Sequence, residues 1–433
     1  MRLIIANDLD DWIVRKTDIR AWSQRMLWFA EQNDVVVSMC SPDPEFVQYV
    51  GELKGIDSTT WSFHTPPNNR FGGKMFDHMS LMDPEFVSSI AKDATRATDV
   101  LVSWPSPLVA QFVDRIGVSD RWPGYPVFAQ AASELFNSKA AFRVFAAGND
   151  VPIAHGTVCR SIDAAAYATS NLLTSNGAAV IKKALGSAGA GNHILTTETD
   201  LDVGGAGCKY LSVIENRSAS ILEFWREHWA WASSSGAYPV VVEAFQRGAR
   251  TIYAEYECAD DGVCLGCIGE LKFSDRSPIG DTVPVVDLGP DERRILLDES
   301  LKLANAYWKL GYRGPLSADA IVATDGAVTF TEVNAQVTGS THVYRILLRL
   351  AGAGRKVSQV FSPQNWMIES TSQFMSMIRR LGCAYDATSR RGIIVTTPRI
   401  GSERTGPIAF ATVYERPDER EDMLRALQNE FDA

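Results

Sequence analysis

The chain has 433 residues, of which 45% are hydrophobic, enough to build two or three domains with their own cores. Its formal net charge of -10 argues against nucleic acid as the main partner, because phosphate backbones bind basic surfaces. Asp8, Asp10 and Asp11 interrupt any signal-peptide core, and no apolar run reaches the ~18 residues of a membrane helix. We therefore expect a soluble cytoplasmic protein that binds neither nucleic acid nor membrane.

The first 135 residues alternate between strand and helix patterns. Short apolar runs predict strands at 2–6, 34–40 and 99–104. Helical spacing predicts helices at 18–32 and 107–116. This alternation is typical of a parallel sheet covered by helices, so we expect a Rossmann-like α/β domain over 1–135. No G-x-G-x-x-G follows the first strand, which argues against a dinucleotide site.

The pattern changes at about residue 136. Helices are predicted at 138–147, 163–176 with Asp163 as N-cap, 218–233 and 291–310. Strands flank a glycine loop in 178–196 and follow at 240–246, 251–258, 263–273, 317–324 and 327–332, which predicts a mostly antiparallel sheet. We divide this α+β part into a lobe at about 178–238 and a core at about 239–350, followed by a small α+β domain at 351–433.

A glycine-rich segment lies between two predicted strands and directly follows two lysines. From Lys182 it reads Lys-Lys-Ala-Leu-Gly-Ser-Ala-Gly-Ala-Gly. Small residues let backbone N–H groups approach phosphate oxygens, and a nearby lysine neutralises their charge. The segment is not a P-loop, because no Gly-Lys-Ser/Thr follows, and it precedes a strand where a dinucleotide fingerprint precedes a helix. It predicts a flexible hairpin lid over a nucleotide, and a mobile surface hairpin fits the pattern equally well.

A second segment predicts a β-hairpin. Asp325-Gly326 lies between two β-rich runs, which is the strongest short-range hairpin signal. If these two residues form the loop, counting outward places Val322 opposite Thr329 and, further along, two acidic residues opposite each other.

Those two acidic residues are Asp319 and Glu332. Their Cβ atoms would lie roughly 5 Å apart on one face, where bare like charges are destabilising. A hard divalent cation such as Mg²⁺ resolves the conflict, and Asn334 adds an amide oxygen on the same face. The other interpretation is a solvated strand end with water between the acids.

A polar turn follows directly. Thr338, Gly339, Ser340 and Thr341 offer hydroxyl and backbone donors suited to a carboxylate or a phosphate. The same residues also fit a helix N-cap before 343–350. Both interpretations are compatible, because a helix N-terminus is itself an anion site.

In this order the segments resemble the ATP-grasp superfamily. The resemblance covers about residues 136–350 and is most specific at Glu332-Val333-Asn334 followed by the polar turn. The first domain resembles the pre-ATP-grasp domain, and the whole layout is similar to stand-alone peptide ligases of natural-product pathways, such as the pheganomycin type. The resemblance implies an enzyme that uses ATP and Mg²⁺ to activate a carboxylate as an acyl phosphate and joins it to an amine.

The resemblance also implies roles for individual residues. It assigns ATP binding to Lys139, Lys182, Ser187, Ala188, Gly189, Gly191, Glu243, Ala244 and Phe245, with Glu243 on the adenine amino group and the Phe245 backbone beside it. It assigns magnesium to Asp319, Glu332 and Asn334. Lys182, Lys272 and Arg345 would act on the transferring phosphoryl group, and Arg313, Thr338, Gly339, Ser340 and Thr341 would contact the substrate. The implied partners are a small carboxylate and an amine (an amino acid or a peptide), and family habit suggests a homodimer.

The sequence departs from the family pattern at two places. Many members have Pro-Arg after the asparagine, where the arginine stabilises the acyl phosphate, but this chain has Ala335 and Gln336, so Arg345 or Arg313 would have to substitute. The ribose-binding acid of the family falls near Arg250.

Other activities are compatible with the same pattern. An ester- or thioester-forming ligase would use the same activation with another nucleophile, and a phosphotransferase would omit the second step. A non-catalytic nucleotide-binding module has no need for two metal carboxylates, which argues against that reading.

Overall fold

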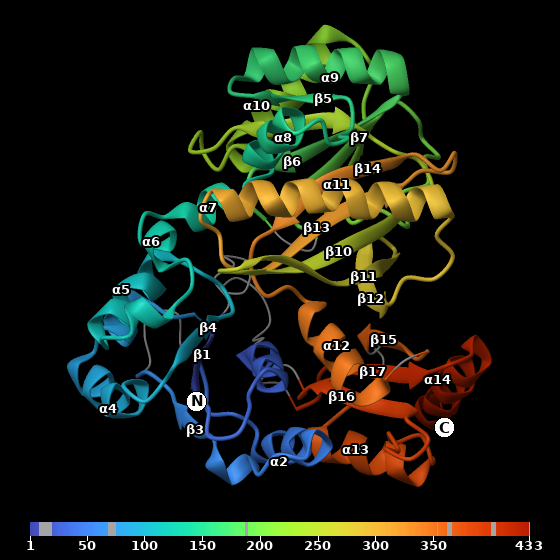
Figure 1. Ribbon diagram of the computed structural model, residues 1–433. Coiled ribbons are helices and arrows are strands. Elements are labelled where there is room, and N and C mark those ends of the chain that lie inside the picture. Colours follow the sequence, from blue (N-terminus) through green and yellow to red (C-terminus); the bar gives the residue numbers. More distant parts are fainter. Residues whose placement is uncertain are drawn as a thin grey trace.

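The computed structural model describes residues 1–7, 20–67, 75–186, 189–352, 354–361, 366–399 and 404–432. Within these ranges the strands form a four-stranded, a five-stranded and an eight-stranded sheet (Figure 1). No helix in the described ranges combines the length and the apolar composition needed to cross a membrane.

The N-terminal domain contains the predicted parallel sheet. Its strand order is β3-β2-β1-β4, with β1 (Arg2–Ala6), β2 (Val35–Ser38), β3 (Ser62–His64) and β4 (Asp99–Val102). Its helices are η1 (Arg20–Trp28), α2 (Pro44–Lys54), η2 (Ser58–Thr60), α3 (His78–Leu81), α4 (Pro84–Ala94), α5 (Pro107–Arg115) and η3 (Ser119–Arg121). Leu3, Ile4 and Ile5 are fully buried, because both faces of a parallel sheet are covered. Of the helix predicted at 18–32, the described residues from 20 onward form the 3-10 helix η1, which ends at Trp28.

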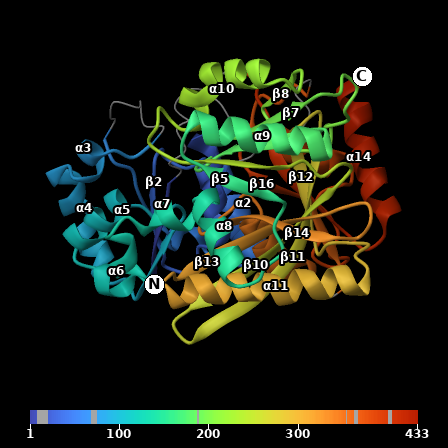
Figure 2. The ribbon, with the colours of Figure 1, turned by 90° about the horizontal axis from the view of Figure 1, so that it is seen from above.

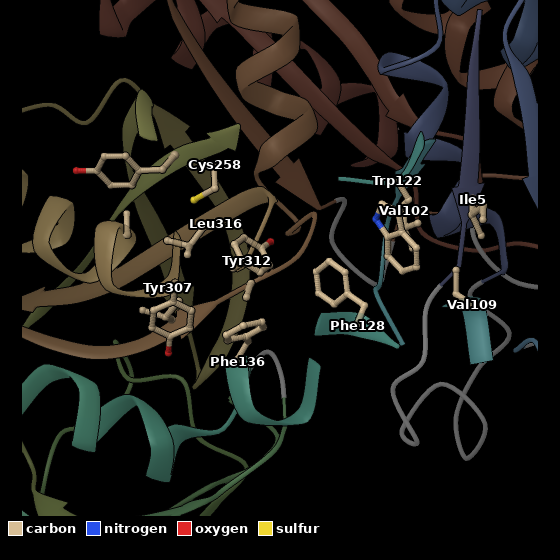
Figure 3. Packing of buried hydrophobic residues seen from close by; sticks show 14 of the residues in the cluster. Ile5, Val102, Val109, Trp122, Phe128, Phe136, Cys258, Tyr307, Tyr312 and Leu316 are labelled. Atoms are coloured by element: carbon tan, nitrogen blue, oxygen red, sulfur yellow. The ribbon is translucent and has the colours of Figure 1, made fainter. Parts of the chain in front are cut away.

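Three helices join this domain to the rest of the chain, namely α6 (Tyr125–Phe128), α7 (Ala132–Phe136) and α8 (Lys139–Gly148). Their aromatic side chains make the core continuous: the Phe128 ring lies 4.9 Å from that of Trp122 and 5.8 Å from that of Tyr312. Figure 3 shows this cluster running from Ile5 on β1 past Phe128 toward Leu316 of the eight-stranded sheet. The N-terminal domain is therefore packed firmly beside the sheet that carries the site.

The five-stranded sheet has the order β5-β9-β6-β7-β8, with β5 (Gly156–Cys159), β6 (Ala178–Lys183), β7 (Asn192–Thr196), β8 (Tyr210–Val213) and β9 (Val240–Ala244). Two of its strands, β5 and β9, lie outside the range 178–238 that was proposed for this lobe. The helices α9 (Ile162–Asn176) and α10 (Ser218–Ala232) pack together, and Figure 2 shows them on the opposite side of the molecule from α11. Helix α9 is capped by Ser161, whose hydroxyl accepts from the Ala164 amide, and not by Asp163 as predicted.

The eight-stranded sheet has the order β14-β13-β10-β11-β12-β15-β17-β16, and every neighbouring pair is antiparallel. Its strands are β10 (Arg250–Ala259), β11 (Gly262–Ser274), β12 (Ser277–Val283), β13 (Gly314–Val322), β14 (Val328–Asn334), β15 (Lys356–Phe361), β16 (Gly392–Thr397) and β17 (Ala409–Tyr414). The remaining helices are α11 (Pro290–Lys309), α12 (Thr341–Ile346), η4 (Leu347–Ala351), α13 (Thr371–Arg380) and α14 (Pro417–Asp432).

Helix α11 packs against β10, β11 and β13 on one face of this sheet (Figure 1). Strands β15, β16 and β17 come from the segment 351–433, and they extend the same sheet. The boundary proposed at residue 350 therefore does not separate two sheets.

Candidate active site

A cavity of about 710 Å³ is lined by side chains from the five-stranded and eight-stranded sheets and from the N-terminal domain. The sequence-predicted residues on its wall are Lys139, Lys182, Gly189, Glu243, Ala244, Phe245, Asp319, Glu332, Asn334, Thr338, Gly339 and Ser340. These residues span about 200 positions of the chain, so the fold gathers them in one place.

The two predicted metal carboxylates lie opposite each other. Asp319 on β13 pairs with Glu332 on β14, and Ser317 pairs with Asn334. The Asp319 carboxylate accepts from the Ser317 hydroxyl at 2.7 Å and from the Asn334 amide at 3.0 Å. Two carboxylates and an amide side chain form an oxygen-bearing set of the kind that Mg²⁺ binds.

The register near the turn differs from the prediction. Val322 faces Val328 and not Thr329, and Ala323 bonds to Ala327 across a three-residue loop. A β-bulge at Thr331 then shifts the register by one residue, so that the acidic pair still forms.

Burial and neighbouring charges shift the carboxyl pKa values of Asp319 and Glu332. Burial, and then the Glu332 charge, raise the pKa of Asp319 to about 8. Burial acts to raise the pKa of Glu332 as well, but the Lys139 ammonium, with Nζ 2.5 Å from Glu332 Oε2, lowers it overall. A bound cation would relieve the repulsion that raises the pKa of Asp319. Within the described ranges no three His, Cys, Asp or Glu side chains gather as metal ligands, so this two-carboxylate set is the candidate.

Two lysines and an arginine surround the acidic groups. Lys182 Nζ lies 2.5 Å from Glu243 Oε1, and Arg143 Nη1 lies 2.9 Å from Glu243 Oε2. Arg143 is therefore a positioning residue for Glu243 on β9. Sequence reasoning missed it because α8 lies about 100 residues before β9 in the chain. The carboxylate that was expected to meet adenine is held between two cations.

The glycine segment lies beside Lys139. The Lys139 ammonium donates to the Gly186 carbonyl at 2.9 Å, and its backbone amide donates to Ala184 at 2.8 Å. Gly189 adopts φ 71°, and a Cβ there would lie 2.6 Å from the carbonyl carbon of Gly207, so glycine is required. Gly189 and Asn192 line the cavity, Gly191 lies off its wall, and Ser187 and Ala188 fall outside the described residues.

The end of β9 and the residue after it contribute to an apolar part of the cavity wall. Ala244 and Phe245 line it, together with Val180, Ile194, Val203, Ala206 and Ile321. The Phe245 amide donates to Ala178 at 3.3 Å, and its carbonyl accepts from the Asn176 side chain at 2.9 Å. The Phe245 backbone groups predicted to meet adenine are thus bonded within the protein.

The polar turn is bonded to a carboxylate of the chain itself. Glu255 Oε1 accepts from the hydroxyls of Ser340 at 2.7 Å, Thr338 at 2.8 Å and Thr341 at 3.2 Å. Burial raises the pKa of Glu255. The prediction that all three hydroxyls face a substrate needs correction, because they donate to Glu255 and Thr341 does not line the cavity.

Comparison with known proteins bears on this arrangement. Residues 23–118 match the family model described as the Pre ATP-grasp domain. Three solved structures of enzymes each match 99% of this chain. Biotin carboxylase from Campylobacter jejuni is 14% identical, with a TM-score of 0.60 over 90% of its own chain. N5-carboxyaminoimidazole ribonucleotide synthetase from Thermus thermophilus is 12% identical, with a TM-score of 0.57 over 98% of its chain, and L-amino acid ligase from Bacillus licheniformis is 14% identical, with a TM-score of 0.55 over 97% of its chain. The chain has the ATP-grasp fold, with a pre-ATP-grasp domain. No curated protein matches it significantly.

Three basic side chains to which the resemblance assigned roles do not line the cavity. Lys272 pairs with Glu270 at 2.6 Å, and its neighbours Leu271 and Phe273 line the cavity, so the strand pleat turns Lys272 to the other face. Arg313 pairs with Asp260 at 3.0 Å and Arg345 with Glu257 at 3.3 Å, and neither lines the cavity.

The arginine on the described wall of this cavity is Arg25, from η1 of the pre-ATP-grasp domain. It is 3% exposed, and its guanidinium donates to the Trp22 carbonyl at 3.1 Å and lies 5.0 Å from the Trp22 ring centroid. Its sequence surroundings are those of an ordinary helix, so only the fold reveals it. Arg250, which stands near the position of the family's ribose-binding acid, pairs with Glu270 at 3.0 Å.

Proposed function

We propose that this protein is an ATP-dependent ligase that activates a carboxylate as an acyl phosphate and couples it to an amine, forming an amide or peptide bond. The observation that carries the proposal is that one cavity brings the Asp319, Glu332 and Asn334 set together with Lys139 and Lys182. Structural neighbours include an ADP complex and an MgADP complex, which supports ATP and Mg²⁺ as ligands here.

The charges in the cavity suit phosphoryl transfer. Negative charge accumulates around the transferring phosphoryl group, so fixed cations nearby lower the barrier. Asp319, Glu332 and Asn334 would hold Mg²⁺, which supplies charge neutralisation when bound. Lys139 and Lys182 would neutralise phosphate oxygens, each from a buried position beside a carboxylate that holds its ammonium in place.

Arg25 takes the role that the resemblance assigned to an arginine after the Asn motif. A guanidinium offers planar paired donors to a carboxylate or phosphate. Arg25 lines the same cavity as Gln336, the residue that stands at the usual arginine position. We assign Arg25 to the acyl phosphate because Arg313 and Arg345 lie off this wall.

Amide formation needs the acyl phosphate to be protected from water. Gly189, Asn192 and Gly207 line the cavity, where they would cover bound phosphates, and Asn192 Nδ2 donates to the Gly207 carbonyl at 2.8 Å. Excluding water there favours attack by the amine over hydrolysis. The finer assignments, namely peptide-bond formation in a natural-product pathway by a homodimer, rest on the resemblance.

The test measures ADP and phosphate release with MgATP over a panel of amino acids and short peptides, with and without hydroxylamine. Carboxylate-dependent ADP release with hydroxamate formation is the expected result. ADP release without hydroxamate would favour a phosphotransferase, and no carboxylate-dependent release would overturn the ligase assignment.

A further inference from the structure

The helix η1, which carries Arg25 to the cavity wall, has an unusual geometry. It is a 3-10 helix of nine residues, whereas runs of more than three or four residues are uncommon in this geometry because the hydrogen bonds are poorly aligned. Arg25 lies in its last turn. The position of the guanidinium therefore depends on contacts from other segments that hold the end of η1 in place.

A buried lysine caps the end of η1. Lys54 is the last residue of α2, and its side chain is 1% exposed. Its ammonium donates to the Trp28 carbonyl at 3.1 Å and the Leu27 carbonyl at 3.5 Å, and it also donates to the Ala30 carbonyl. A buried ammonium is costly unless acceptors surround it, so these carbonyls are drawn together around Nζ. Two of them belong to the turn of η1 that carries Arg25.

An arginine from another part of the chain completes this cluster. Arg349 lies on η4, which directly continues α12. Its guanidinium donates to the Lys54 carbonyl at 2.8 Å and 3.2 Å, and to the two Glu31 carboxylate oxygens at 2.8 Å and 3.1 Å. Glu31 Oε1 also lies 3.8 Å from Lys54 Nζ. Arg349, Glu31 and Lys54 thus join η4, α2 and the end of η1 in one network, which we call the clasp.

The clasp differs from the contacts at the start of η1. There, the Trp22 ring packs edge-on against His342 of α12, with 6.2 Å between the ring centroids. The Trp28 indole adds one hydrogen bond, to the Thr396 carbonyl at 2.9 Å. Ring packing is largely non-directional, so it tolerates a small rotation of the helix. Charge-assisted hydrogen bonds have a defined geometry, so the clasp can fix the direction of Arg25.

We propose that the clasp of Arg349, Glu31 and Lys54 is a positioning device that holds Arg25 at the cavity wall for phosphoryl transfer. The inference rests on the proposed ligase function and on the role given there to Arg25. Arg349 does not line the cavity, so it acts through η1 and is not a catalytic residue.

Loss of Arg349 should loosen the end of η1 while the rest of the protein stays folded. The Arg349 and Glu31 side chains are 39% and 51% exposed, so their pairing contributes little to global stability. Without the guanidinium, the Glu31 carboxylate would compete with the backbone carbonyls for the Lys54 ammonium. The phosphate-binding lysines lie on α8 and β6, so the affinity for MgATP should not change.

The test measures kcat and the KM for MgATP from ADP release with the best acid of the panel. The proteins are wild type, Arg349→Met, Arg349→Lys, Arg25→Lys and the double variant Arg25→Lys/Arg349→Met. Arg380→Met is the matched control, because Arg380 forms a similar fork with Glu430 away from the cavity. Hydrogen exchange of the amides of residues 20–31 is measured without substrate, so that the clasp is tested independently of turnover.

We expect Arg349→Met to lower kcat about tenfold and to leave the KM for MgATP within about twofold, because a small misplacement of a catalytic group slows the reaction. Arg349→Lys should recover part of the loss, since a lysine can still pair with Glu31. In the Arg25→Lys background, Arg349→Met should cost less than about twofold, because two residues that act through one group are not additive. Arg380→Met should behave as wild type.

The hydrogen exchange has its own expected result. Amides at 20–31 should exchange at least about tenfold faster in Arg349→Met than in wild type, and at the wild-type rate in Arg380→Met. Urea unfolding checks that each variant is folded. If Arg349→Met does not fold, Arg349→Lys takes its place in both comparisons.

The outcomes separate the two proposals. An additive loss of kcat in the double variant, or unchanged exchange at 20–31, would overturn the clasp and leave the ligase intact. If wild type shows no carboxylate-dependent ADP release, the ligase assignment fails, and the exchange rates alone decide whether the clasp holds η1.

Discussion

Lys182 and Glu243 form a buried ion pair, with 2.5 Å between Lys182 Nζ and Glu243 Oε1. The two residues are diagonal neighbours on one face of the β6–β9 pair, because Val180 stands opposite Glu243. A buried ammonium held by a carboxylate stays charged and oriented, which is what phosphate binding requires. The next residue, Lys183, is absent from the cavity wall and lies 6.0 Å from the Trp231 ring centroid.

Replacing Lys182 should therefore affect nucleotide binding while replacing Lys183 should not. We expect Lys182→Met to weaken MgATP binding about 10- to 100-fold, the value of one charge-assisted hydrogen bond to phosphate. Lys183→Met serves as the matched control. Calorimetric titration of both variants with MgATP measures the difference, and equal weakening in the two variants would refute the assignment.

The metal assignment predicts a magnesium-dependent defect. Glu332→Gln removes one anionic ligand and the partner of Lys139, so we expect ADP release to fall at least about 100-fold at low Mg²⁺ and to recover in part as Mg²⁺ is raised. Asp325→Asn, at the exposed turn of the same hairpin, should behave as wild type. Unchanged turnover of Glu332→Gln at every Mg²⁺ concentration would disprove the metal site.

Substitution of Arg25 should lower kcat more than substitution of Arg345, one of the arginines that the resemblance implied. Arg25→Lys keeps the charge but loses the planar pair of donors, so we expect kcat to fall tenfold or more. Arg345→Lys changes a half-buried ion pair away from the cavity and should leave kcat within twofold of wild type. Steady-state kinetics with MgATP and the best acid of the panel tests both, and the reverse order of effects would move the role to Arg345.

The five-stranded sheet should lose stability in acid. Burial, followed by the neighbouring His228, lowers the pKa of His193 from 6.5 to about 4. Between these values the unfolded chain binds more protons than the folded one, so the stabilisation is complete above about pH 6.5 and is lost as the pH falls toward 4. We expect a loss of about 1–3 kcal/mol over this window relative to His193→Phe. Urea unfolding at several pH values measures it, and parallel pH profiles for the two proteins would contradict it.

The sequence predicted the element types because hydrophobic periodicity and turn residues are local signals. The parallel sheet, the glycine hairpin between β6 and β7 and the Asp319–Glu332 pair are all present in the structure. The register of that last hairpin shows the limit of local reasoning. The loop has three residues and not two, and the bulge at Thr331 compensates, so the correct pair was reached through an incorrect count near the turn.

Side-chain direction and long-range contact were decided only by the tertiary structure. The pleat of β11 turns Lys272 out of the cavity, and Glu255 takes the three hydroxyls of the polar turn, because each of these contacts joins segments that no local pattern connects. Arg25 on the cavity wall and Arg143 beside Glu243 reach the site in the same way. Composition and motif order predicted the fold, whereas packing between distant segments determined which charged groups face the cavity, because burial and partner choice depend on neighbours in space and not in sequence.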